Sequence, residues 1–190
     1  METNLEIEFK CLINAQQYNQ IKNDLFSDSQ GFTQTNEYLI DKKQLLKKHR
    51  WSLRVRHIHN QLEFTLKKPE GFSKLEINEQ LTPMQYQQLC RQEKFESGIL
   101  QELKQIGISI EDLTIATSLT TTRLEKSYKH GLLCLDLNTY QNLTDYEIEY
   151  EALNEKEGRE IFKELLAPYQ IIYQANCLGK MARALNASTI

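Results

Sequence analysis

The sequence is poor in the residues and patterns that mark several large classes of protein. It has only three prolines and seven glycines among 190 residues, so no proline-rich or flexible linker divides it. The net charge of −3 disfavours a nucleic-acid binder that relies on overall positive charge. There is no long apolar run and no recognisable signal peptide, so we expect a cytoplasmic protein with no membrane partner. Since 40% of its side chains are apolar, the chain is predicted to fold as one domain over residues 1–190.

Motifs that usually carry cofactor or metal chemistry are also missing. The cysteines are Cys11, Cys90, Cys134 and Cys177. No two of them have the spacing of a zinc knuckle, and we expect reduced thiols. The sequence has no Walker loop, dinucleotide-binding fingerprint or nucleophile elbow. Any binding of phosphate must therefore come from side chains rather than from a glycine-rich backbone loop.

What the sequence does contain is alternation of apolar and polar residues in eight short stretches. These predict β-strands over residues 4–12, 33–41, 51–58, 61–68, 73–81, 118–128, 131–140 and 144–152. Their short connections predict antiparallel hairpins. Amphipathic patterns predict helices over residues 15–26, 83–91, 97–106, 154–166 and 178–185, with Thr82 as an N-cap. The predicted fold class is α+β, dominated by one antiparallel sheet.

The two faces of this predicted sheet differ in chemistry. One face is apolar, and the amphipathic helices are expected to pack against it. The other face is ionic: Glu6, Glu8 and Lys10 lie two residues apart in the first strand and therefore project together. The ionic face is either open to water or turned inward by closure of the eight strands into a barrel, which would form a charged channel.

Charges of one sign collect on single strands of the ionic face. Arg54 and Arg56 share one strand, and Glu147 and Glu149 share another. Like charges two residues apart repel each other, which suggests a ligand that compensates them. Carboxylates suit hard cations such as Mg²⁺ or Mn²⁺, and several arginines and lysines suit a chain of phosphates. For any one strand, an ordinary solvated face remains the alternative.

The ordered series of charged residues resembles the CYTH domain family, also called triphosphate tunnel metalloenzymes, and most closely its small bacterial members. The resemblance starts with the Glu-x-Glu-x-Lys strand from Glu6 to Lys10 and continues through Ser52-Leu53-Arg54-Val55-Arg56 to Lys180. It implies that the eight antiparallel strands close into a barrel, or tunnel, with helices packed on the outside. It also implies an enzyme that binds a triphosphate end-on with Mg²⁺ or Mn²⁺.

The resemblance implies a role for each charged residue of the ionic face. The implied metal ligands are Glu6, Glu8, Glu76, Asp136, Glu147 and Glu149. The implied phosphate ligands are Lys10, Arg54, Arg56, Lys67, Arg123 and Lys180. Lys67, Tyr38 and Glu149 are the candidates for a direct part in catalysis, with Tyr38 as a partner of Lys67.

Three functions are compatible with this pattern. The leading prediction is a metal-dependent phosphohydrolase that acts on inorganic triphosphate or on an organic triphosphate. The first alternative is a class IV-type adenylyl cyclase, which makes cyclic AMP and pyrophosphate from ATP, because the strand pattern does not fix which phosphorus meets the nucleophile. The second is a module that binds polyphosphate or a nucleotide without turnover. The expected partner is a small-molecule triphosphate or nucleotide, not nucleic acid, and a homodimer is left open.

Several nearby charged residues are excluded from the predicted site. Asp41 is displaced by one residue from an acid common in relatives, and Glu79 has the opposite parity to Glu76; a shift of one residue turns a strand side chain to the other face. Beside a turn, His57 is expected at the surface. The basic run 47–50 is expected to be a solvated loop, with the steering of anions into the channel as the alternative.

Overall fold

The computed structural model describes residues 1–188 and contains eight strands and six α-helices. The strands are β1 (Glu2–Ile13), β2 (Phe32–Asp41), β3 (Ser52–Ile58), β4 (Gln61–Glu70), β5 (Ser73–Leu81), β6 (Leu113–Tyr128), β7 (Gly131–Tyr140) and β8 (Leu143–Ala152). The helices are α1 (Ala15–Leu25), α2 (Leu45–His49), α3 (Pro83–Cys90), α4 (Gly98–Gln105), α5 (Glu155–Leu166) and α6 (Lys180–Ala187). Two short 3₁₀ turns, η1 (Ile110–Asp112) and η2 (Ala167–Tyr169), precede β6 and follow α5.

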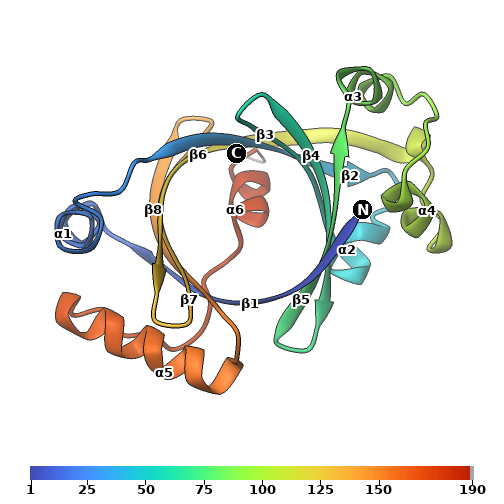
Figure 1. Cartoon of the computed structure of the whole chain (residues 1–190). Helices are drawn as coiled ribbons and strands as arrows, with labels where there is room; N and C mark the ends of the chain where they lie inside the picture. The colour runs from blue at the N-terminus through green and yellow to red at the C-terminus, as the bar shows by residue number, and fades with distance from the viewer. Residues whose placement is uncertain (189–190) are drawn as a thin grey trace.

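The strands form a closed antiparallel barrel in the order β1-β5-β4-β3-β2-β6-β7-β8 (Figure 1). β1 closes the ring, since Glu2–Glu6 pair with β5 and Ile7–Ile13 pair with β8. A barrel of eight strands leaves no free edge and has an interior wide enough for side chains or a small ligand. The predicted eight-stranded barrel is confirmed, and the open sheet is excluded.

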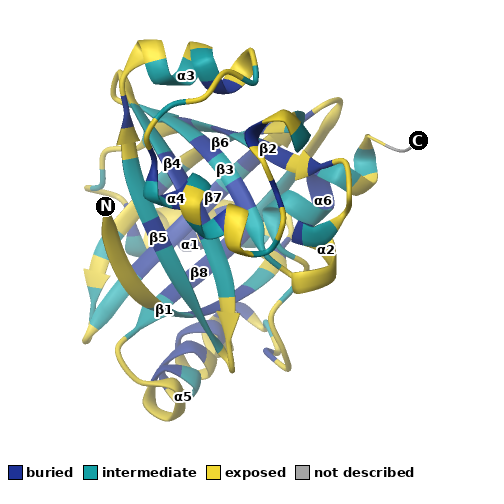
Figure 2. Ribbon diagram, turned by 90° about the vertical axis from the view of Figure 1, so that its right-hand side faces the viewer, coloured by how far each residue is buried: buried dark blue, intermediate teal, exposed yellow. Residues whose placement is uncertain are grey.

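The outer face of the barrel is apolar and carries helices in two groups. α1 and α5 pack over β1, β7 and β8 around Phe9, Leu135 and Ile148. α2, α3 and α4 cover β3, β4 and β5 around Leu53 and Phe64. Buried residues therefore run along the strands, whereas exposed residues gather on the helices and hairpin ends (Figure 2).

Helices begin at side chains that satisfy free backbone N–H groups. The hydroxyl of Thr82 accepts a hydrogen bond from the backbone N–H of Gln85 at 3.2 Å, with Pro83 at the first helical position. Asn14 and Asn154 cap α1 and α5 in the same way. The predicted N-cap at Thr82 is confirmed.

α6 lies at one mouth of the barrel. It is seen within the outline of the ring in Figure 1 and toward the right-hand end of the molecule in Figure 2. Ala184 is fully buried in a cluster with Tyr38, Leu119 and Tyr140. The helix starts at Lys180 rather than at the predicted residue 178, and Lys180 lines the interior of the barrel.

Two further differences from the predicted elements concern the basic run 47–50 and the start of β6. The basic run 47–50 is not simply a loop, because most of it belongs to α2, which the sequence did not predict. The carboxylate of Asp41 accepts hydrogen bonds from the backbone N–H groups of Leu45 and Leu46 at 2.9 and 2.8 Å, and the Leu46 side chain is buried. β6 begins at Leu113 rather than at residue 118, since it pairs with β2 as far as Asp41.

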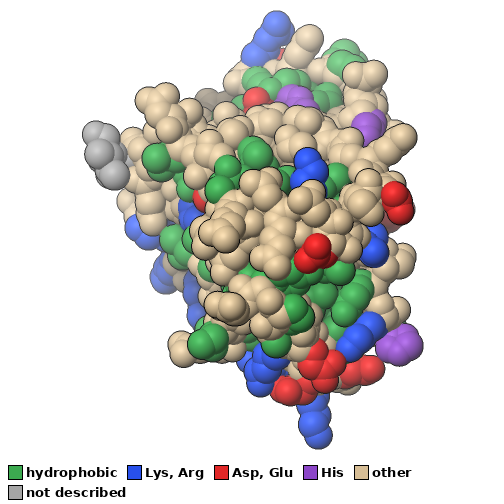
Figure 3. All heavy atoms as spheres, turned by 90° about the vertical axis from the view of Figure 1, so that its left-hand side faces the viewer, with side chains coloured by type: hydrophobic (Ala, Val, Ile, Leu, Met, Phe, Trp, Pro, Cys, Tyr) green, Lys and Arg blue, Asp and Glu red, His purple; other side chains and the backbone are tan. Residues whose placement is uncertain are grey.

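The face of the molecule drawn in Figure 3 shows mixed charge rather than one sign. Acidic and basic side chains lie together at the lower edge of the face in Figure 3, the height at which α5 lies in Figure 1. On α5, Arg159 pairs with Glu155 at 3.2 Å and Lys163 pairs with Glu160 at 2.9 Å. Among the described helices, none is long and apolar enough to cross a membrane.

Candidate active site

The interior of the barrel is a cavity of about 1310 Å³. Its cations are Lys10, Lys42, Lys47, Arg50, Arg54, Arg56, Lys67, Lys68, Lys74, Arg123 and Lys180, and its anions are Glu6, Glu8, Asp41, Glu76, Glu149 and Glu151. Eleven cations against six anions make the cavity positive, although the whole chain has a net charge of −3. The ionic faces of the strands thus converge on one shared interior, which is the condition for holding a polyanion.

Three buried carboxylates meet beside α6. Asp136 on β7 and Glu147 and Glu149 on β8 each have a carboxylate oxygen within 4.8 Å of the others. Strand pairing sets Asp136 opposite Glu147, and alternation along β8 turns Glu147 and Glu149 to the same side. We call these three residues the acidic cluster. Its oxygen donors fit a hard divalent cation.

Three cations of the same chain bind the acidic cluster directly: Arg183, whose Nη1 is 2.6 Å from Glu147, and two predicted phosphate ligands. Lys180 Nζ lies 2.9 Å from Asp136, 2.5 Å from Glu147 and 2.6 Å from Glu149. Arg123 donates to both carboxylate oxygens of Asp136, at 2.8 and 2.6 Å, and to Glu149 at 2.5 Å. The structure therefore places two predicted phosphate ligands on three predicted metal ligands rather than apart from them.

These contacts keep Glu149 charged despite its burial, whereas burial, and then the charge of Glu149, raise the pKa of Glu147 to about 7 even beside Lys180. Burial favours the neutral form of Glu149, but Lys180 and Arg123 outweigh this effect and hold the pKa of Glu149 well below its ordinary value. Burial also opposes the charge of Lys180, yet Asp136 and the two glutamates raise its pKa well above the ordinary value. Near neutral pH, Glu149 is therefore a carboxylate and Lys180 an ammonium group.

Glu8 lies on β1, the neighbour of β8, and is 7% exposed. Lys10 Nζ donates to Glu8 Oε1 at 2.6 Å, and Lys74 also contacts this carboxylate. Burial raises the pKa of Glu8, but Lys10, Lys74 and Lys67 more than compensate and hold it well below its ordinary value. Glu8 is therefore an ionised carboxylate in the cavity wall.

Lys67 on β4 joins two further carboxylates. Its Nζ donates to both oxygens of Glu6, at 3.0 and 2.9 Å, and also contacts Glu76. Tyr38 was expected beside Lys67, but its ring packs with Leu119 and the residues of α6. Tyr38 still lines the cavity, but the partners of Lys67 are Glu6 and Glu76 instead.

Arg54 and Arg56 on β3 are weakly neutralised cations. Arg54 Nη2 lies 3.9 Å from Glu76, and its buried Nε has no hydrogen-bond partner among the described residues. Arg56 donates from Nε to Asn36 Oδ1 at 3.2 Å, and its Nη1 is 3.5 Å from Glu63. Burial, together with the charge of Arg54, lowers the pKa of Arg56 to about 10. This adjacent pair has donors to spare for phosphate oxygens.

The sequence analysis did not select Lys74, Glu151 or Asn36, although all three line the cavity. Strand parity was a signal for the first two, because Lys74 lies two residues before Glu76 and Glu151 two residues after Glu149. Burial, and then the charge of Glu6, raise the pKa of Glu151 to about 7. Asn36 gave no such signal because it carries no charge.

Other basic side chains line the cavity near α2 and the β4–β5 hairpin. They are Lys42, Lys47, Arg50, Lys68 and Lys74. The Trp51 ring lies beside them, with Lys68 Nζ 4.5 Å from its centre. The basic run 47–50 contributes Lys47 and Arg50 to this lining, where an incoming anion would meet them. That they steer anions into the cavity stays a prediction.

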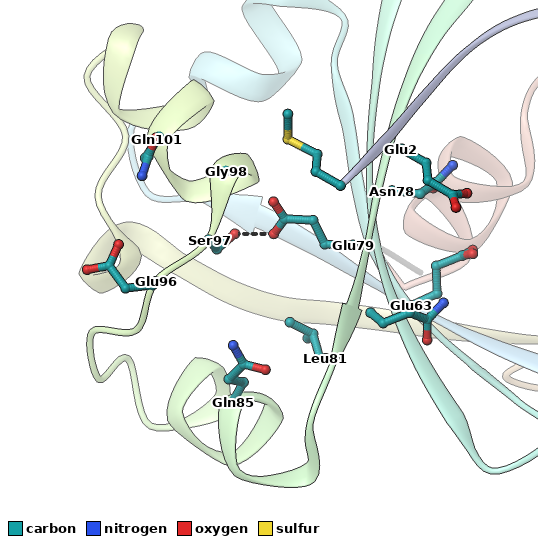
Figure 4. Close-up of a pocket in the computed structure, with 12 residues that line it drawn as sticks. Glu2, Glu63, Asn78, Glu79, Leu81, Gln85, Glu96, Ser97, Gly98 and Gln101 are labelled. Carbon is teal, nitrogen blue, oxygen red and sulfur yellow. Dashed lines mark hydrogen bonds between the residues drawn. The ribbon is translucent and has the colours of Figure 1, made fainter.

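A second hollow, of about 540 Å³, lies beside β5, α3 and α4 (Figure 4). Its lining includes Glu2, Glu63, Glu79 and Glu96 and no lysine or arginine, so it would repel phosphate. Glu79 accepts hydrogen bonds from Ser97 Oγ at 2.5 Å and from the Ile99 backbone N–H at 3.2 Å, at the start of α4. The expected outer position of Glu79 is confirmed.

His57 also lies away from the lining of the barrel cavity, with its Nε2 3.0 Å from Glu37.

Comparison with known proteins agrees with this architecture. A family model described as the CYTH domain matches residues 4–177. A Bacillus subtilis (strain 168) protein named "Putative triphosphatase YjbK" is 33% identical over 172 residues, which is 90% of each chain. A Bacillus halodurans crystal structure, described as "a putative adenylate cyclase", is 30% identical, covers 96% of this chain and 98% of its own, and has a TM-score of 0.88. The Hippeastrum protein HpAC1 shares the fold at 19% identity and a TM-score of 0.79, over 96% of this chain and 95% of its own. The chain belongs to the CYTH domain family.

Proposed function

We propose that the protein is a metal-dependent triphosphatase, which releases orthophosphate from inorganic triphosphate or from an organic triphosphate bound in the barrel. The observation that carries the proposal is the relation between β3 and β8. They are four strands apart in a ring of eight, so they face each other across the cavity. The weakly neutralised pair Arg54 and Arg56 therefore stands opposite Glu149.

The arginine side of the cavity would hold the phosphate chain. Arg54 Nε is buried and has no partner in the described part of the chain, so a phosphate oxygen would satisfy it. Arg56 would bind a neighbouring oxygen, and Lys67 would approach from the adjacent strand β4. These groups orient the terminal phosphorus toward the carboxylates of β1 and β8, and positioning of this kind accounts for most of catalysis in phosphoryl transfer.

The carboxylate side would hold the cation. The acidic cluster and the neighbouring Glu8 provide oxygen donors of the type that Mg²⁺ or Mn²⁺ binds, with Glu6 and Glu76 farther along the wall. When bound, such a cation neutralises phosphate oxygens and favours attack by water. Glu149 lines the cavity as an ionised carboxylate, a position from which it can orient that water.

A cyclase is the second candidate because the Bacillus halodurans relative, at 30% identity, is described as "a putative adenylate cyclase". Hydrolysis is favoured because the 33% identical Bacillus subtilis relative is named "Putative triphosphatase YjbK". The description of HpAC1, a more distant protein, states that a dominant triphosphatase activity was found in it.

We also place the protein in the cytoplasm, since its four cysteines are free thiols.

The test is product analysis of the purified protein with inorganic triphosphate, ATP or thiamine triphosphate, each with Mg²⁺, Mn²⁺ or EDTA. Hydrolysis predicts orthophosphate from at least one substrate, and none in EDTA. Cyclic AMP with pyrophosphate would establish the cyclase instead. Tight binding of triphosphate without any product would make the protein a binding module.

A further inference from the structure

Lys180 occupies an unusual position for a predicted phosphate ligand. It is the first residue of α6, and its ammonium group contacts all three carboxylates of the acidic cluster within 2.9 Å. Asp136 and Glu147 do not line the cavity themselves, although Lys180 does. Lys180 thus stands between the deepest carboxylates and the cavity.

Each carboxylate of the acidic cluster already contacts a cation of the same chain, without any added metal. Lys180 and Arg123 bind the cluster from two directions, and Arg183 Nη1 lies 2.6 Å from Glu147. Arg183 is shared with Asp145, so three positive groups already serve these carboxylates in a region where Asp136 and Glu147 are fully buried. A divalent cation placed there alone would add two positive charges beside three cations that are already bound away from water, which is costly.

The location of the ammonium group is also the location that a bound cation would need. A cation held by all three carboxylates must lie between oxygens that are within 4.8 Å of one another. Lys180 Nζ lies in that space, at 2.5 to 2.9 Å from all three residues. Charge repulsion and overlap exclude joint occupancy.

We propose that the ammonium group of Lys180 takes the place of the divalent cation in the metal-free protein. There it holds the acidic cluster together, and it leaves the cluster when a polyphosphate and its cation arrive together. The proposal rests on the proposed function only for the identity of the anion. The phosphate chain carries the negative charge that compensates the divalent cation. Its oxygens also give the ammonium group of Lys180 a new binding partner. Metal binding is therefore weak alone and strong with polyphosphate.

The exchange requires movement of one side chain rather than of the helix. α6 stays anchored because Ala184 is fully buried and Arg183 Nε binds Asp145 at 2.9 Å. Lys180 has a flexible stem of four carbons and already borders the cavity, so its ammonium group can turn toward bound phosphate.

The experiment measures Mn²⁺ binding by the loss of the free Mn²⁺ signal in electron paramagnetic resonance, using metal-free protein with or without non-hydrolysable imidotriphosphate. The variants are Lys180→Met and, as a matched control, Lys129→Met, which removes an exposed lysine paired with Glu164 on the outer surface. We expect imidotriphosphate to strengthen Mn²⁺ binding to the wild type and to the control at least about tenfold. Lys180→Met should bind Mn²⁺ at least about tenfold more tightly than the wild type without the anion.

Equal Mn²⁺ affinity of the wild type and Lys180→Met, both folded by circular dichroism, would overturn the proposal, even if the variant lost all activity. That result would make Lys180 a phosphate ligand alone. If Lys180→Met does not fold without metal, Lys180→Gln replaces it, and the same comparison decides. The product assay is separate: a protein without triphosphatase activity whose Lys180 variant gains Mn²⁺ affinity would refute the proposed function and support this inference.

Discussion

The two sides of the cavity treat buried charge in opposite ways. On the side of β7 and β8, every carboxylate of the acidic cluster contacts at least one cation of the same chain within 2.9 Å. On the side of β3, the carboxylate nearest to Arg54 is 3.9 Å away, and the nearest to Arg56 is 3.5 Å away. The side of β7 and β8, the acidic side, has all its ion pairs without a ligand. On the side of β3, the arginine side, the repulsion between Arg54 and Arg56 remains, and a bound phosphate would relieve it. The difference indicates that stability is built into the acidic side and anion binding into the arginine side.

The largest expected effect is on turnover, from removal of one carboxylate charge. Glu8→Gln keeps the size of the side chain but removes the negative charge that Lys10 and Lys74 contact. We expect kcat for triphosphate hydrolysis to fall about a thousandfold, a loss of about 4 kcal/mol of transition-state stabilisation. The measurement is steady-state release of orthophosphate at saturating Mg²⁺. The matched control is Glu164→Gln on the outer surface of α5, and a fully active Glu8→Gln protein would remove this residue from the metal site.

The comparison predicts that removal of an arginine from the acidic side costs stability. Arg123→Ala leaves Asp136 and Glu149 with one cation fewer in a buried position. We expect the free energy of unfolding to fall by about 3 kcal/mol, as is typical when a buried ion pair loses one partner. Urea unfolding of metal-free protein at pH 7 measures this. An unchanged midpoint would mean that the acidic side is not held together by its ion pairs.

The same change on the arginine side should affect binding instead. Arg56→Ala removes a guanidinium that lies beside Arg54 and forms one hydrogen bond to Asn36. We expect KM for triphosphate to rise about 10- to 100-fold, with the free energy of unfolding unchanged or raised by up to about 1 kcal/mol as repulsion is relieved. Steady-state kinetics and urea unfolding of the same preparation test both parts. If Arg56→Ala is destabilised as strongly as Arg123→Ala, the two sides do not differ.

Most of the fold could be predicted because alternation along a strand is a local property. Glu6, Glu8 and Lys10 stand at intervals of two, and their parity indicated which face they share. α2 was missed because its formation depends on the side chain of Asp41, whose carboxylate binds the helix from outside it. A five-residue helix has too short a sequence pattern to be recognised alone.

The site was only half predictable for a different reason. Parity placed Arg123 and Glu149 in one interior, and the family resemblance added Lys180, but neither said which of them are in contact. Contacts depend on the register between β6, β7 and β8 and on the packing of α6, which local patterns do not specify. The opposite treatment of charge on the two sides of the cavity therefore became visible only in three dimensions.

The smallest effect concerns Glu151, a carboxylate of the cavity that lies on β8 but is not part of the acidic cluster. In the described part of the chain, no lysine or arginine nitrogen lies within 4.0 Å of its carboxylate, and burial raises its pKa from 4.5 to about 7. The folded state therefore binds a proton at the Glu151 carboxylate more tightly than the unfolded chain does. The contribution of Glu151 to stability must fall as pH rises from about 4.5 to about 7 and then stay level.

Glu151→Gln removes this dependence, so the difference in unfolding free energy between variant and wild type isolates it from all other titrating groups. We expect the variant to match the wild type near pH 4.5 and to be more stable by about 1 kcal/mol at pH 8, a value reduced because the side chain is partly exposed. Urea unfolding in EDTA at pH values from 4.5 to 8 measures the difference. A difference that does not change with pH would mean that the cations of the arginine side reach Glu151 and keep it ionised, and the two sides would then be electrostatically joined rather than separate.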